Sequence, residues 1–177
     1  MKNALYFALF FILVNCGKEK PGGIVRTAVP NNGVFTFSID AVIRKDDALS
    51  LYYTTDGSID FAKKPAIWID VKGSSDSQKI VFSLEKGIVP TQLRIDLGKN
   101  PKQDDIYLHK VSMAYGGKSV EIPGTLIFSY FRPDVTKTKA DATTGMVKGI
   151  VVDGLRRSPS LYPKEGPLSG EIKKLLR

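Results

Sequence analysis

The chain has 177 residues and, with 26 lysines and arginines against 18 aspartates and glutamates, a formal net charge of +8. This length is that of one domain, and the single cysteine excludes an intramolecular disulfide. One histidine and one cysteine also argue against a zinc site, which needs three or four nitrogen or sulfur ligands. We therefore expect no metal and no cofactor. The positive charge suits acidic partners such as anionic lipid or acidic polysaccharide, or solubility alone.

Eleven consecutive apolar residues, Ala4 to Val14, lie between Lys2 and Cys16. The run is shorter than the roughly 20 residues of a membrane span, and it has the length of the apolar region of a secretory signal. The segment Leu13-Val14-Asn15-Cys16 resembles a bacterial lipobox, although Asn15 departs from the usual small residue. Residues 1–15 are therefore predicted to be a lipoprotein signal peptide, with Cys16 lipidated. The alternatives are a signal for ordinary cleavage and a short tail helix that stays.

The resemblance to lipoproteins implies a place in the bacterial cell envelope, with acyl chains on Cys16 as the membrane anchor. No aspartate follows Cys16, which favours the outer membrane, on its periplasmic or its surface face. Export also makes nucleic acid an unsuitable partner. Residues 17–23 are polar and rich in glycine, and 16–33 are predicted to be the lipidated cysteine and a flexible tether.

Residues 34–131 are predicted to form a β-sandwich domain, because apolar and polar residues alternate along them. Strands are predicted at 34–43, 49–55, 66–71, 79–84, 92–97, 106–115, 120–122 and 125–131. Within 106–115 the alternation shifts at His109-Lys110, which indicates a bulge. Strands at near-regular spacing with turn signals between them are typical of an antiparallel sandwich.

Residues 132–177 lack this alternation and are predicted to form a C-terminal segment that wraps back over the sandwich. The segment contains prolines, glycines and few apolar pairs. At its end Leu168, Ile172, Leu175 and Leu176 follow the spacing of one helix face. The predicted fold class is thus all-β, an antiparallel β-sandwich with an irregular C-terminal segment that ends in a short helix.

The runs from Leu51 to Gly57 and from Leu93 to Gly98, with the segments between them, resemble jelly-roll domains of bacterial surface and glycosyltransferase-associated proteins. Those domains are similar to carbohydrate-binding modules. The likeness covers about Phe35 to Met113. It implies a jelly-roll-like fold, and it implies carbohydrate or envelope polysaccharide as the partner. A fold likeness carries less about activity than about architecture.

Five residues are candidates for ligand binding: Trp68, Tyr52, Tyr53, Arg94 and Asp96. Aromatic rings offer a flat apolar contact to a pyranose, and an arginine and a carboxylate can meet its hydroxyls. Trp68 is predicted to point away from the apolar set of its strand, and the alternative is that it packs in the core. Arg94 and Asp96 share one face of a strand, and the alternative is an ion pair between them. Tyr52 and Tyr53 are consecutive, so at most one of them can join any site.

No residue is assigned a catalytic role, and we expect a protein that is not an enzyme. The sequence contains neither Gly-x-Ser-x-Gly nor a phosphate-binding Gly-x-x-x-x-Gly-Lys-Ser/Thr segment. The acids Asp104-Asp105 and Asp56/Asp60 suit either a structural calcium or solvated turns. The sequence thus favours an envelope lipoprotein that binds carbohydrate. The alternative is a structural or adaptor lipoprotein that docks a protein partner through a sheet face or the terminal helix.

Overall fold

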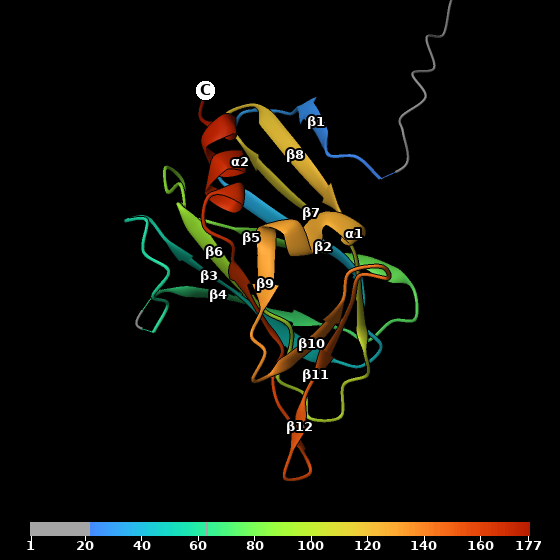
Figure 1. Cartoon of the computed structure of the whole chain (residues 1–177). Coiled ribbons are helices and arrows are strands. Elements are labelled where there is room, and N and C mark those ends of the chain that lie inside the picture. The colour runs from blue at the N-terminus through green and yellow to red at the C-terminus, as the bar shows by residue number, and fades with distance from the viewer. Residues whose placement is uncertain (1–21, 63) are drawn as a thin grey trace, which may run out of the picture.

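The structure is a computed structural model, and it describes residues 22–62 and 64–177. The predicted signal peptide, residues 1–15, lies outside the described residues. So do Cys16 and residues 17–21 of the predicted tether. The chain forms two antiparallel sheets packed as a sandwich, with a short helix close to the C-terminus (Figure 1). The predicted all-β class is confirmed. None of the helices in the described ranges has the length and apolarity of a membrane span.

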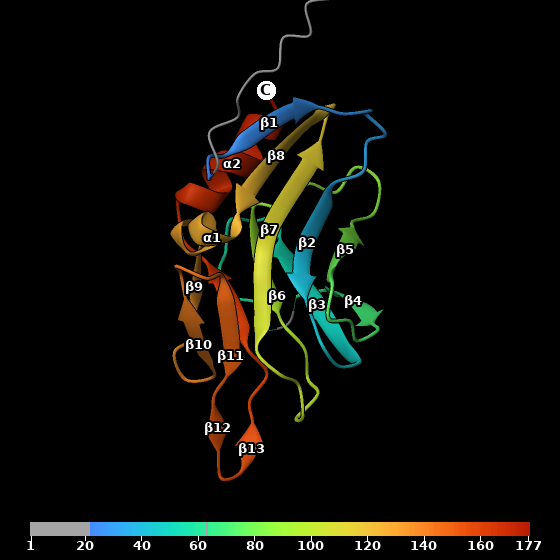
Figure 2. The same ribbon diagram turned by 90° about the vertical axis from the view of Figure 1, so that its right-hand side faces the viewer.

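The larger sheet has seven strands. Its order is β1 (Val25–Ala28), β8 (Lys118–Pro123), β7 (Ile106–Tyr115), β11 (Met146–Gly149) and β10 (Thr138–Asp141), with β2 (Thr36–Val42) paired to β7 and β5 (Ser77–Ser83) paired to β2. The smaller sheet has the order β4 (Ala66–Val71), β3 (Asp47–Thr54), β6 (Gln92–Asp96), β14 (Ser160–Pro163) and β9 (Phe131–Pro133). A separate hairpin of β12 (Val151–Val152) and β13 (Leu155–Arg156) projects from the end of the molecule opposite β1 and α2 (Pro167–Leu175) (Figure 2).

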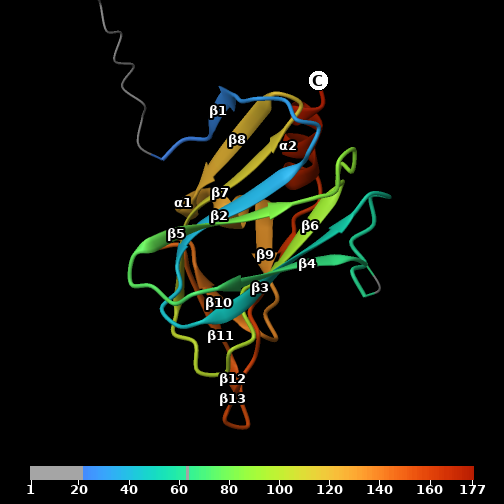
Figure 3. The same ribbon diagram turned by 180° about the vertical axis from the view of Figure 1, so that it is seen from behind.

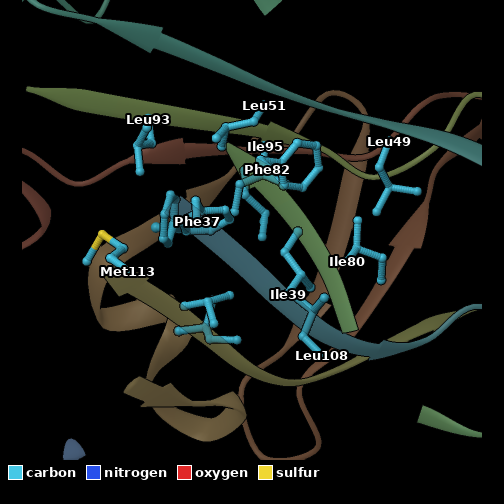
Figure 4. Close-up of a cluster of buried hydrophobic side chains, with 14 of the residues drawn as sticks. Phe37, Ile39, Leu49, Leu51, Ile80, Phe82, Leu93, Ile95, Leu108 and Met113 are labelled. Carbon is cyan, nitrogen blue, oxygen red and sulfur yellow. The ribbon is translucent and has the colours of Figure 1, made fainter. Parts of the chain in front are cut away.

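The core lies between the two sheets and follows the predicted alternation. From 34–43 the inward residues Phe35, Phe37, Ile39, Ala41 and Ile43 are all fully buried. Figure 4 shows Phe37 and Ile39 of this set close to core side chains from other strands. Each large apolar side chain of this kind contributes about 1.5–3 kcal/mol through burial.

The predicted irregularity in β7 is confirmed as a bulge at His109. Asp40 of β2 pairs with Lys110, while the next residue, Ala41, pairs with Leu108. His109 is therefore the extra residue on β7, and it is exposed. The bulge allows Leu108 and Val111, which are an odd number of residues apart, both to face the core.

The strand predicted at 125–131 is wrong, because this segment forms helix α1 (Gly124–Tyr130) and then enters β9. Ile127 of the helix and Phe131, the first residue of β9, are both fully buried. A side chain at Gly124 would overlap the carbonyl oxygen of Leu108, so only glycine allows the helix to start this close to β7. Packing on β7 thus outweighs the strand preference of the aromatic and branched residues.

The segment 132–177 is part of the sandwich instead of a cover over it. β9 and β14 extend the smaller sheet, and β10 and β11 extend the larger one. Residues 25–28 of the predicted tether likewise form β1, which pairs with β8. The strands of the C-terminal segment are two to four residues long, too short to show alternation. The predicted terminal helix is confirmed as α2, with Leu168, Ile172 and Leu175 buried.

Candidate functional site

The outward face of the smaller sheet, turned away from the larger sheet, carries four of the five candidate residues. In the register, Tyr52 lies opposite Arg94, and Ser50 lies opposite Trp68 on one side and Asp96 on the other. Strands β4, β3 and β6, which supply these residues, are neighbours in the sheet (Figure 3). Tyr53 points to the opposite face and packs against the core, so the structure separates it from the other four.

Arg94 lies between two tyrosine rings on this face. Its guanidinium carbon is 4.8 Å from the ring centre of Tyr52 and 4.7 Å from that of Tyr162, and the guanidinium of Arg132 is 5.2 Å from Tyr162. These distances are typical of cation–π contacts. Sequence reasoning missed Tyr162, because β14 is too short for its pairing partner to be predicted.

Arg94 and Asp96 bind each other. Arg94 Nε donates to Asp96 Oδ1 at 2.9 Å, and Nη2 donates to Oδ2 at 2.8 Å. Each side chain is only 15% exposed. This is the ion-pair alternative that the sequence left open. The Nε–Nη2 edge, one of the two edges of the guanidinium that can bind a ligand in a bidentate manner, is already used.

The loop between β3 and β4 covers the tyrosine–arginine stack. Phe61 of this loop is nearly fully buried, and its ring meets that of Tyr162 edge-on at 6.0 Å. The loop is held by Thr54, whose hydroxyl donates to the Ser58 carbonyl at 2.7 Å, and by Lys64, whose ammonium is 2.8 Å from Asp56. The covered stack is a second packed layer and leaves little room for a ligand.

Trp68 is the candidate that remains accessible. Trp68 is 51% exposed, so the alternative of core packing is wrong. Trp68 lies on the edge strand β4, and the ammonium of Lys99 is 4.8 Å from its ring centre. Below, the Trp68 surface means Trp68 and Lys99. It joins a flat apolar ring to a positive charge, which suits a sugar that carries an acidic group.

The buried carboxylate of Asp47 holds the backbone at Lys99 in place. Asp47 Oδ1 accepts hydrogen bonds from the backbone N–H of Lys99 at 2.7 Å and of Asn100 at 2.9 Å, and Oδ2 accepts one from Gln103 at 3.0 Å. Lys99 itself is exposed. Sequence reasoning missed Lys99. Nothing in the residues around this lysine indicates that it contacts a tryptophan on another strand.

Ser50 lies beneath the Trp68 surface with its hydroxyl buried. Within the part of the chain that the structure describes, this hydroxyl oxygen has no hydrogen-bond partner. An unpartnered buried hydroxyl costs about 1–3 kcal/mol. The packing around Ser50 therefore does not explain why this buried position of the face carries a hydroxyl.

The loop acids considered for calcium are, with one exception, bound to lysines. Asp56 lies 2.8 Å from Lys64, Asp104 lies 3.0 Å from Lys45, and Asp105 lies 3.4 Å from Lys148, while Asp60 accepts a hydrogen bond from the backbone of its own loop. The hydrogen bond from Lys64 lowers the pKa of Asp56 below its ordinary value. Among residues 22–62 and 64–177, no three histidine, cysteine, aspartate or glutamate side chains are grouped as metal ligands would be.

A comparison of the chain with protein-family models, with curated proteins and with solved structures found no match. The architecture is consistent with a jelly-roll-like sandwich. What the protein does must therefore be inferred from the chemistry of its surfaces.

Proposed function

We propose that this chain is a lipid-anchored protein of the bacterial envelope that binds carbohydrate at the Trp68 surface and catalyses no reaction. The observation that carries the proposal is the exposure of the sole tryptophan on a strand whose other face packs in the core. A tryptophan that is half open to water forgoes much of the free energy that its burial would supply. A rigid, exposed ring is the group that stacks on the apolar side of a pyranose.

The charge around Trp68 favours an acidic sugar over a neutral one. The ammonium of Lys99 lies over one face of the ring, and Asp47 holds the backbone of Lys99. A uronate that stacks on Trp68 can place its carboxylate near this ammonium, where a charge-assisted hydrogen bond forms. The excess of lysine and arginine over aspartate and glutamate adds a long-range attraction for acidic polysaccharide.

A glycan array probed with the purified chain tests this proposal, with Trp68→Ala as the test variant. Loss of a stacking aromatic should weaken binding by about 2 kcal/mol or more, while a thermal melt should show that the variant still folds. Leu155→Ala is the matched control, because Leu155 is also an exposed apolar residue but lies on the distant β12–β13 hairpin. Binding that is equal in all three proteins would contradict the proposal.

Docking of a protein partner is the second candidate function, and one observation favours it. The β12–β13 hairpin exposes Val151, Val152 and Leu155, whose exposed fractions are 61%, 36% and 61%. Exposed apolar side chains on a projecting hairpin are common at protein contacts. If envelope proteins co-purify with the chain and Leu155→Asp abolishes this while glycan binding is absent, the adaptor function is the correct one.

A further inference from the structure

A pocket of about 480 Å³ lies where the loop after β6 meets β11 and the β12–β13 hairpin. Its walls include Arg44, Lys102, Tyr107, Lys148, Val151 and Arg156. The volume is that of a typical site for a small molecule. Neither Trp68 nor Lys99 lines it, so the pocket is separate from the Trp68 surface.

The positive charges of the pocket exceed the negative ones. Its two acids are both engaged, Asp104 with Lys45 outside the lining at 3.0 Å and Asp105 with Lys148 at 3.4 Å. Arg44, Lys102 and Arg156 form no ion pair with any residue in the described ranges. Three cations that line one cavity and form no ion pair within the described chain favour an anionic occupant.

Arg156 is the most confined of these cations. Its Nη1 donates to the Asn100 carbonyl at 3.2 Å, while Nη2 is buried and has no hydrogen-bond partner among the described residues. The side chain runs across Gly149, where a Cβ atom would lie only 2.7 Å from Cγ and 2.9 Å from Nε of Arg156. Burial lowers the pKa of the Arg156 guanidinium, against the opposing effect of Asp47 and Asp105.

The wall beside the charges offers an aromatic ring and is well fixed. Arg44 lies over the ring of Tyr107 at 5.7 Å, so a guanidinium and an aromatic ring lie next to each other in this wall. Gln103 ties the loop to the rest of the fold, because its side-chain amide donates to the Lys45 carbonyl at 2.9 Å and to Asp47 at 3.0 Å. A pocket that is formed before binding lowers the entropy cost of holding a ligand.

We propose that this pocket binds a small organic anion, with its carboxylate or phosphate group among Arg44, Lys102 and Arg156 and its body against Tyr107. Guanidinium groups suit this role because their planar N–H groups match the oxygens of both anions. The site is independent of carbohydrate binding at the Trp68 surface.

Calorimetric titration of the purified full chain with inorganic phosphate, glucuronate and glucose tests the proposal. Phosphate or glucuronate should bind saturably and more weakly as salt is added, and glucose should not bind here. The tighter of the two anions identifies the preferred group. Arg156→Gln should weaken binding at least about tenfold, the effect of losing hydrogen bonds to a charged group. Lys102→Gln should also weaken anion binding. Because Lys102 lies at an exposed loop position, this variant replaces Arg156→Gln if the latter does not fold.

Lys173→Gln on α2 is the matched control, because it removes the same charge from an exposed position away from the pocket. Its affinity for phosphate should equal that of the unchanged chain, and so should the phosphate affinity of Trp68→Ala. Glucuronate is titrated into Trp68→Ala, because a uronate is also the proposed ligand of the Trp68 surface. Absence of saturable binding by either anion would overturn the proposal. A loss of phosphate affinity in Lys173→Gln equal to that in Arg156→Gln would also overturn it. So would a loss of phosphate affinity in Trp68→Ala, which would place the anion at the Trp68 surface.

Discussion

Arg26 of β1 and Glu171 of α2 join the two ends of the described chain. Arg26 Nη2 donates to Glu171 Oε2 at 2.7 Å across a separation of 145 residues, and Lys174 donates to the other oxygen, Oε1, at 2.8 Å. The Glu171 side chain is almost fully buried, whereas both cations reach solvent. One carboxylate thus fastens both a strand from the predicted tether and the terminal helix.

Replacement of Glu171 by Gln should destabilise the fold by about 1–3 kcal/mol, because a neutral amide loses two charge-assisted hydrogen bonds at a buried position. Chemical denaturation measures this. Burial acts to raise the pKa of Glu171, but the hydrogen bonds from Lys174 and Arg26 outweigh it and hold the pKa below its ordinary value. The contribution should be complete above about pH 4.5, the ordinary pKa of a glutamate, and should be lost as the pH falls through the lowered pKa.

The pH dependence of stability distinguishes the contribution of the Glu171 charge from the contributions of the other acidic residues. The difference in stability between the unchanged chain and Glu171→Gln should shrink as the pH falls from neutral into the acid range. A difference that stays constant down to pH values where the unchanged chain unfolds would show that Glu171 acts through packing and not through its charge.

Phe82→Ala should cost about 3–5 kcal/mol of stability, because it leaves a large cavity in the sandwich interior. Phe82 is fully buried, and its ring lies 6.3 Å from that of Phe37. Val81→Ala is the neighbouring control, since Val81 is 44% exposed and should lose less than about 1 kcal/mol. A larger loss in Val81→Ala than in Phe82→Ala would mean that β5 has the opposite orientation.

Arg94→Ala should destabilise the fold by about 2–3 kcal/mol, because the Asp96 carboxylate, which is only 15% exposed, would be left without its partner. The control is Lys72→Ala, which breaks the pair of Lys72 and Asp46 at 2.7 Å, where the side chains are 91% and 64% exposed. An exposed pair contributes less than about 1 kcal/mol. Urea titration measures the free energy of unfolding of both variants. If Arg94→Ala lost no more stability than Lys72→Ala, the conclusion that the tyrosine–arginine stack is covered would be contradicted.

Cys16→Ser should abolish labelling of the protein by a clickable fatty acid and move it to the soluble fraction, if Cys16 carries the acyl chains of the anchor. Loss of two or three chains removes most of the membrane affinity, since each buried CH₂ contributes about 0.8 kcal/mol. Labelling and fractionation of cells that express either form measure this. Unchanged fractionation of the serine variant would rule out the lipid anchor.

The sequence predicted the strands in which apolar and polar residues alternate over a long enough stretch to be recognised. The five inward residues from Phe35 to Ile43 and the bulge at His109 both follow from periodicity, which depends only on neighbouring residues. It failed at 125–131, where strand-forming residues adopt a helix because Gly124 packs against the backbone of β7. It also missed β9 to β14, since strands this short are defined by distant partners.

The alternation of side chains along a strand was enough to predict that Trp68 points away from the core. Whether an outward residue is exposed depends on what covers the sheet, and this could not be predicted. The β3–β4 loop places Phe61 against Tyr162, so Arg94 is covered, while Trp68 on the edge strand stays open. Lys99 joins Trp68 only because the buried Asp47 positions its backbone, which is a contact across 52 residues.

The central claim, that the Trp68 surface binds carbohydrate, is tested most directly by titrating tryptophan fluorescence with glycans, because Trp68 is the sole tryptophan. A uronate-containing glycan should change the emission saturably, and Lys99→Gln should weaken this binding while leaving that of neutral glycans unchanged. A glycan that binds by calorimetry without altering Trp68 emission, or the absence of any glycan that binds, would contradict the claim.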